Sequence, residues 1–168
     1  GKIPDGAVLL SLLDNPHALI RHKAHAIMRQ HLSVFIRDGQ FVFQLLSHAS
    51  PDIRRETRDA MANIAEVLTE VQQQALLGRL VTALMVSPFP EEIAAAMQGW
   101  SERYWPQLGP ALIEQLLRHP MEPVATFGAM LVEKRPKTPE YLPNALLEWM
   151  LDANHATLRD AAIRAVEA

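Results

Sequence analysis

The chain has 168 residues, of which 49% are hydrophobic and 21% charged, and its formal net charge is −3. This composition is typical of a globular domain, and the slightly acidic balance argues against a dedicated nucleic-acid binder. The absence of cysteine excludes disulfides, thiolate metal sites and a cysteine nucleophile, and it favours a cytoplasmic location. Since no apolar run approaches the roughly 20 residues of a membrane span, we expect no membrane partner.

One pattern recurs along the chain: an apolar helix, a short turn with Pro or Asn, a branched apolar anchor residue, and a second amphipathic helix. In chain order the five copies occupy residues 9–28, 44–61, 84–100, 116–132 and 147–166. Their anchors are Ile20, Ile53, Ile93, Val124 and Leu158, with spacings of 33, 40, 31 and 34 residues. Such spacings are typical of two-helix repeats.

Apolar residues follow each anchor at about +4, +7 and +8, which places them on one helix face. The pattern therefore predicts an all-α protein of ten helices in five antiparallel pairs, with an irregular bundle as the alternative. The predicted core contains the anchors and, in the last helix, Val166. Because the sequence starts without Met and ends in a helix-like segment, we expect residues 1–168 to form a single domain of a longer protein.

The prolines divide the expected helices. Ser50-Pro51 and Ser87-Pro88 each have the pattern of an N-cap residue followed by Pro at the first helical position. We predict a loop at residues 136–140, with Thr138-Pro139 opening the next helix.

An Asp, Asn or Pro in the turn, followed by a branched apolar residue and Arg, resembles the HEAT-repeat family over nearly the whole chain. The residues that carry this likeness are Asp14-Asn15-Pro16 with Ile20-Arg21, Pro51-Asp52-Ile53-Arg54, and Asn154 with Leu158-Arg159. The resemblance implies an α-solenoid curved into a right-handed superhelix. It also implies that Arg21, Arg54 and Arg159 are structural and bond the turn acids along the stack. Copies three and four depart from the pattern, with Ala94 and Ala125 in place of Arg.

A basic stripe is predicted on the second helices of the first two copies. Its members are Lys23, His25, Arg29, Arg55 and Arg58. In HEAT-like solenoids the second helices line the concave surface, so the stripe could hold an acidic peptide or nucleic-acid phosphates. The alternative is a solvated face, neutralised locally by Glu56, Asp59 and Glu66, and we favour this interpretation.

The only concentration of aromatic residues comprises Trp100, Tyr104 and Trp105. Trp100 lies seven residues after Ile93 and so is in phase with the apolar helix face, which favours core packing. The alternative is an exposed anchor for a partner, since Trp and Tyr dominate interface hot spots. We keep all three as candidate partner-binding residues.

Motifs for catalysis and cofactors are missing from the sequence. It has no Gly-rich phosphate loop, no G-x-S-x-G and no H-E-x-x-H. His22, His25 and His31 lack a carboxylate at a spacing suited to zinc, so we predict no metal, no cofactor and no enzymatic activity.

The sequence therefore favours a scaffold that binds a protein or peptide on its concave helix surface. Two alternatives stay open. One is nucleic-acid binding through the basic stripe, and the other is a regulatory repeat domain of a larger enzyme. The oligomeric state is not predicted.

Overall fold

In a computed structural model, residues 2–134 and 142–167 are described, and they contain eleven α-helices, one 3₁₀ helix and no strand. The all-α prediction is therefore confirmed for these residues. The helices are α1 (Gly6–Leu13), α2 (Ala18–Phe35), α3 (Gly39–Leu46), α4 (Pro51–Met61), α5 (Ile64–Val67), α6 (Glu70–Leu84), α7 (Pro90–Met97), η1 (Glu102–Gln107), α8 (Pro110–Leu117), α9 (Glu122–Glu133), α10 (Asn144–Leu151) and α11 (Ala156–Glu167).

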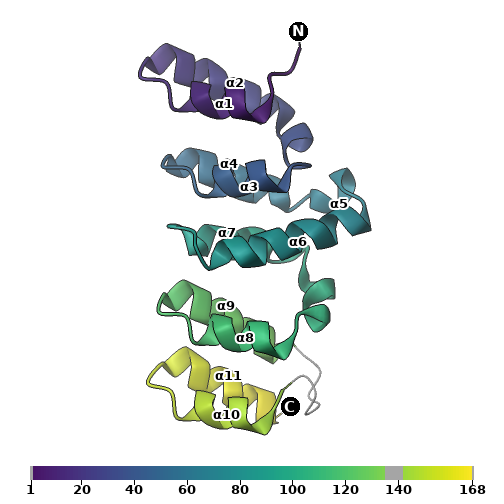
Figure 1. Cartoon of the computed structure of the whole chain (residues 1–168), viewed down its shortest axis with the longest axis vertical. Helices are drawn as coiled ribbons and strands as arrows, with labels where there is room; N and C mark the ends of the chain where they lie inside the picture. Colours follow the sequence, from purple (N-terminus) through teal and green to yellow (C-terminus); the bar gives the residue numbers. More distant parts are fainter. Residues whose placement is uncertain (1, 135–141, 168) are drawn as a thin grey trace.

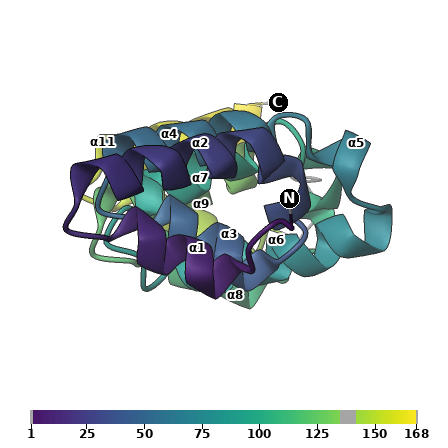
Figure 2. The same cartoon turned by 90° about the horizontal axis from the view of Figure 1, so that it is seen from above.

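The helices are stacked along the long axis of the molecule in chain order (Figure 1). Seen from above, α2, α4, α7, α9 and α11 form one layer, the second-helix layer, and α1, α3, α6 and α8 lie in the first-helix layer (Figure 2). Consecutive helices pack across the layers, α1 on α2, α3 on α4, α6 on α7, α8 on α9 and α10 on α11. Within the second-helix layer each helix also contacts the next one in the stack.

Two short helices were not predicted, so the expected number of ten was too low. The first, α5, lies between α4 and α6, where the side chain of Ile64 is fully buried. The second, η1, lies between α7 and α8 and contains the buried Tyr104 and Trp105. Both segments are connections that turn helical because they bury apolar side chains against the stack, which a helix-length periodicity does not reveal.

The anchors lie where the repeat pattern predicts them. Ile53, Ile93, Val124 and Leu158 are buried, while Ile20 is half-buried. The prediction for Val166 is wrong, since its side chain is 65% exposed. The buried residues of α11 are instead Leu158 and the alanines Ala161, Ala162 and Ala165, and the helix packs against α9.

In four of the turns that join the two helices of a pair, a side chain accepts a hydrogen bond from the backbone N–H two residues later. The acceptors are Asn15, His48, Ser87 and His119, at 2.9 to 3.1 Å. Ser50 is the N-cap of α4 with Pro51 at the first position, as predicted. The Ser87-Pro88 prediction is wrong, because α7 begins at Pro90 and Ser87 holds the turn instead. The predicted loop at 136–140 and the Thr138-Pro139 start lie outside the described residues.

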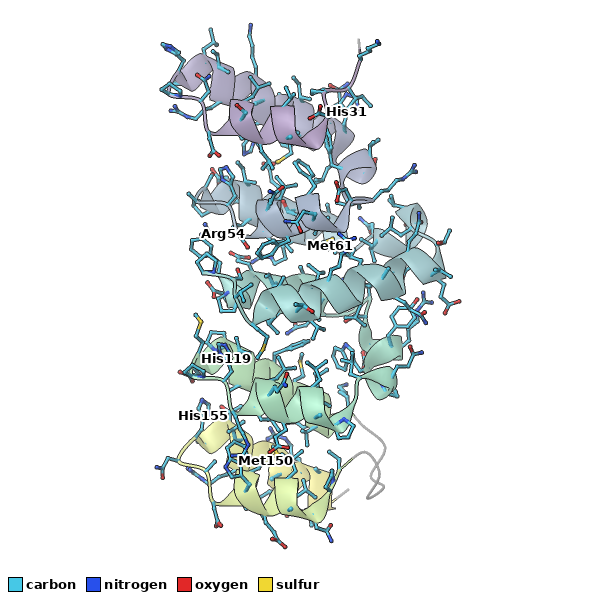
Figure 3. All side chains as sticks on the ribbon, in the orientation of Figure 1. His31, Arg54, Met61, His119, Met150 and His155 are labelled. Atoms are coloured by element: carbon cyan, nitrogen blue, oxygen red, sulfur yellow. The ribbon has the colours of Figure 1, made fainter. Side chains whose placement is uncertain are left out.

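The same turns contact one another along one edge of the stack, on which Figure 3 labels Arg54, His119 and His155. The contacts are His48 Nε2 to Asp14 Oδ1 at 3.0 Å, Ser47 Oγ to Ser87 Oγ at 3.0 Å, His119 Nε2 to the Met85 carbonyl at 3.3 Å, and His155 Nε2 to Glu122 Oε1 at 3.5 Å. Each turn is thereby tied to the next by a polar contact, which sets the vertical register of the helices.

The closest approach of α8 and α9 depends on Gly128. A Cβ at this position would lie 3.0 Å from the backbone nitrogen of Leu117 and 3.1 Å from Leu116 Cβ. Since backbone cannot move aside cheaply, we expect Gly128→Ala to lower the free energy of unfolding by about 1–3 kcal/mol, as measured by urea denaturation with far-ultraviolet circular dichroism.

Gly78 in the middle of α6 is the matched control, because nothing lies within 4 Å of a Cβ there. Gly78→Ala should raise the free energy of unfolding by about 0.5–1 kcal/mol through helix propensity. A Gly128→Ala protein as stable as the wild type would contradict the close α8–α9 packing.

Candidate binding surface on the second-helix layer

Arg21, Arg54 and Arg159 begin three of the second helices, and each guanidinium donates to carbonyl oxygens of the turn before its own helix. Arg21 Nη1 lies 2.7 Å from the Asn15 oxygen and 2.8 Å from the Pro16 oxygen. Arg54 Nη1 and Arg159 Nη1 both lie 2.6 Å from a turn carbonyl, those of His48 and Ala153. These arginines therefore hold the turns. The resemblance implied a turn carboxylate as their partner, but these hydrogen bonds go to backbone carbonyls.

Arg54 has the richest surroundings of the three. Its second turn acceptor is the Ala49 carbonyl at 2.9 Å, and its guanidinium carbon lies 3.7 Å from the centre of the Phe89 ring. Its Nε is 3.7 Å from Glu92 Oε1 in α7, and the side chain is only 12% exposed. One side chain thus connects its own turn, the next turn and the next helix of the second-helix layer.

The structure brings three members of the predicted basic stripe together. His25 and Arg29 of α2 and Arg55 of α4 line an open groove of about 490 Å³ between the two helices, which we call the α2/α4 groove. Arg21 and His22 also line it, as do the carboxylates Asp52 and Glu56. The groove is polar and carries more cationic than anionic side chains.

The cations of the α2/α4 groove already face carboxylates. His25 Nδ1 lies 3.6 Å and Arg29 Nε 3.8 Å from Glu56, and Arg55 Nη2 lies 2.8 Å from Asp52 Oδ1. Arg29 and Arg55 are nonetheless 54% and 58% exposed, so ligands can reach both side chains.

The other two members of the stripe lie outside this groove. Arg58 pairs with Glu92 of α7 at 3.1 Å and with Asp59 at 3.6 Å, and Lys23 is exposed on α2. The predicted neutralisation therefore includes Glu56 and Asp59, with Asp52 and Glu92 added by the fold. Glu66 lies in α5, outside the second-helix layer.

These three aromatic residues form core contacts, so the favoured prediction of core packing is confirmed, and the alternative of an exposed partner-binding anchor is wrong for all three. Trp100, Tyr104 and Trp105 are 8%, 2% and 3% exposed. Trp105 packs edge-on against Phe127 with ring centres 6.2 Å apart, and its Nε1 donates to Ser101 Oγ at 2.8 Å. Because all three rings are buried in the stack, they add stability and are not available for contact with a partner.

A second groove, of about 390 Å³, lies between α7 and α9, and we call it the α7/α9 groove. Its lining is mostly apolar and includes Ala94, Ala95, Phe127 and Met130. Two carboxylates, Glu91 and Glu122, lie at the ends where both helices begin. Gln98 Nε2 is 3.7 Å from Met130 Sδ and bridges the opposite end.

The two grooves occupy equivalent places in the stack. Ile20 in α2 and Ile93 in α7 are equivalent anchors. The residues one, two and five positions after Ile20 line the α2/α4 groove, and the residues one, two and five positions after Ile93 line the α7/α9 groove. The corresponding pairs are Arg21 with Ala94, His22 with Ala95, and His25 with Gln98. Counted from Ile53 and Val124, Arg55 corresponds to Thr126 and Glu56 to Phe127. The same site thus recurs with different chemistry.

Sequence reasoning did not single out the α7/α9 groove. It noted Ala94 only as a departure from the HEAT pattern. The signal that the sequence offered was the presence of Ala94 and Ala125 at the positions where the other copies have arginine. This signal indicates a groove only when the fold is known, because Thr126 and Phe127, which lie across the groove from Ala94, are more than 30 residues away in the sequence.

No protein-family model matches the sequence, and the curated proteins contain no significant match. Within residues 2–134 and 142–167, no group of three or more His, Asp or Glu side chains is arranged to hold a metal ion. In the same ranges, no helix combines the length and apolarity required to cross a membrane.

Removing the guanidinium of Arg54 should destabilise the protein. Arg54→Ala leaves two turn carbonyls without their donor and Glu92 with one cation fewer, so we expect a loss of about 2–4 kcal/mol in urea unfolding. Arg54→Lys should lie between the wild type and Arg54→Ala, because an ammonium group lacks the planar fork.

Arg55→Ala is the matched control, one position away on the same helix. Its ion pair with Asp52 is exposed, so its loss should cost less than about 1 kcal/mol. Equal destabilisation by Arg54→Ala and Arg55→Ala would argue against the structural role of Arg54.

Proposed function

We propose that the chain is a HEAT-like α-solenoid that acts as a protein-interaction scaffold and binds its partner on the second-helix layer, without catalytic activity of its own. The carrying observation is the presence of two open grooves, each large enough for side chains, on this one layer. Because both grooves are open rather than enclosed, they suit the side chains of an extended segment better than a small molecule, which is usually bound in a site that buries most of its surface. The right-handed superhelix and the cytoplasmic location stay predictions.

The charges of the second-helix layer favour a protein partner over nucleic acid. The exposed cations Arg29 and Arg55 face Glu56 and Asp52, so a phosphate backbone would find few unpaired charges. A nucleic acid lying along the stack would also meet Glu91 and Glu122 at the α7/α9 groove. Since phosphate contacts supply most non-specific nucleic-acid affinity, this arrangement is unfavourable for it. A regulatory domain of a larger enzyme would use the same surface.

The test is selection from a display library of random peptides against the immobilised protein. Thr126→Trp fills the α7/α9 groove from an exposed position, and Ala111→Trp adds the same bulk to the first-helix layer, on α8. We expect selected peptides to lose at least about tenfold in affinity for Thr126→Trp and to bind Ala111→Trp like the wild type.

Two results would overturn the proposal. One is a peptide set that binds both Trp variants and Arg29→Glu/Arg55→Glu as well as the wild type, since neither groove of the second-helix layer would then be the binding surface. The other is micromolar binding of short DNA or RNA that falls steeply with salt and is lost in Arg29→Glu/Arg55→Glu, which would make the basic stripe a phosphate site.

A further inference from the structure

The α7/α9 groove has the properties of a site for a long cationic side chain. Its floor is apolar, with Ala94 and Phe127 buried, and its carboxylates are confined to one end. Among the described residues Glu91 has no ion-pair partner, whereas Glu122 Oε1 lies 3.5 Å from His155 Nε2. Lys and Arg bury a hydrocarbon stem along apolar surface and present a charged end group, and this matches the groove from floor to rim.

The helix starts do not cancel this negative charge. Each N-terminus carries the equivalent of about half a positive charge, which stabilises Glu91 and Glu122 where they stand. Two full carboxylates on two adjacent helix starts still leave a net negative rim. An incoming cation is therefore attracted, and an incoming carboxylate is repelled.

The equivalent α2/α4 groove has the opposite preference. Arg29 and Arg55 are more than half exposed on either side of it, and Arg21 also lines it, with its guanidinium bonded to the turn. Asp52 and Glu56 neutralise part of the positive charge of this groove. The positive charge that remains suits a carboxylate, with one negative charge, better than a dianionic phosphate. The occupant predicted here is an Asp or Glu side chain.

The two grooves are separated by two helix spacings in the second-helix layer, because α4 and α7 lie between their outer helices. At 8–10 Å between neighbouring helix axes, the groove centres are about 16–20 Å apart. An extended chain rises about 3.3 Å per residue and covers this distance in about five or six residues.

On the basis of the proposed function, we infer that the partner is an extended protein segment of defined charge order. It places an Asp or Glu in the α2/α4 groove and, about five or six residues away, a Lys or Arg in the α7/α9 groove. The charge complementarity of the two equivalent grooves carries this assignment, and it specifies both the two residue types and their separation.

The experiment uses labelled synthetic peptides in an Ala/Ser background, each with a Glu-Glu pair and a Leu-Lys pair. The spacer between the pairs is the predicted one, a much shorter one or a much longer one, and both orders are made. Fluorescence anisotropy on the whole chain should show at least about tenfold tighter binding for the predicted spacer in one order.

Charge reversal then assigns each end of the peptide to its groove. Glu91→Lys should weaken binding of the Glu/Lys peptide at least about tenfold, and a peptide with Glu in place of its Lys should regain binding to this variant alone. Arg29→Glu should likewise weaken binding of the Glu/Lys peptide, and a peptide with Lys in place of its Glu-Glu pair should regain binding to this variant alone. Glu114→Lys, on the exposed surface of α8, is the control and should leave binding unchanged.

Equal binding of all spacers, or failure of the complementary peptide to rescue Glu91→Lys, would overturn the inference. Peptides from the library that depend on the α7/α9 groove but lack the acid–base spacing would do so as well, while leaving the proposed function intact. Loss of groove dependence in the library selection would instead remove the proposed function itself.

Discussion

The hydrogen bonds that hold the turns are the constraint on which the stack depends. The carbonyls of these turns lie beyond the end of the preceding helix, so they have no partner within that helix and need another donor. In turns 14–17 and 47–50 a guanidinium from the next helix fills this need, with Arg54 donating at 2.6 and 2.9 Å to two carbonyls. Since the arginine belongs to the second helix, the same contact fixes the direction in which that helix leaves the turn. The apolar faces can then meet the neighbouring helices in register.

Where the guanidinium is missing, its loss coincides with a mostly apolar groove. Ala94 and Ala125 stand in the places of Arg54, and the turns before them are held by the side chains of Ser87 and His119. Each of these accepts from one backbone N–H, which stabilises the turn without covering the surface of the next helix. Ala94 consequently becomes part of the α7/α9 floor. Replacing Arg by Ala at this position therefore removes the hydrogen bonds to the turn and leaves an apolar lining in the α7/α9 groove.

The sequence predicted the all-α fold and the buried anchors because a 3.6-residue apolar period survives in every copy, as at Ile53, Ile93 and Val124. It did not predict η1, whose shape follows from burying Tyr104 and Trp105 rather than from a local pattern. It placed Val166 in the core, although the neighbouring Ala165 is buried and Val166 is exposed. The grooves were out of reach because their residues, such as Ala95 and Thr126, meet only through stacking.

The charged side chains of the second-helix layer form ion pairs between neighbouring helices, and the same side chains would contact a ligand. Glu56 lies within 3.6–3.8 Å of both His25 and Arg29, so a ligand carboxylate in the α2/α4 groove competes with a carboxylate of the protein. Replacing one exposed ion pair by another gains little free energy, on the order of 1 kcal/mol or less. Appreciable affinity therefore requires several such contacts made together, and a segment that spans both grooves supplies them. A stack of helices with small, equivalent grooves is suited to this kind of additive recognition, since its specificity lies in the order of the grooves rather than in any one of them.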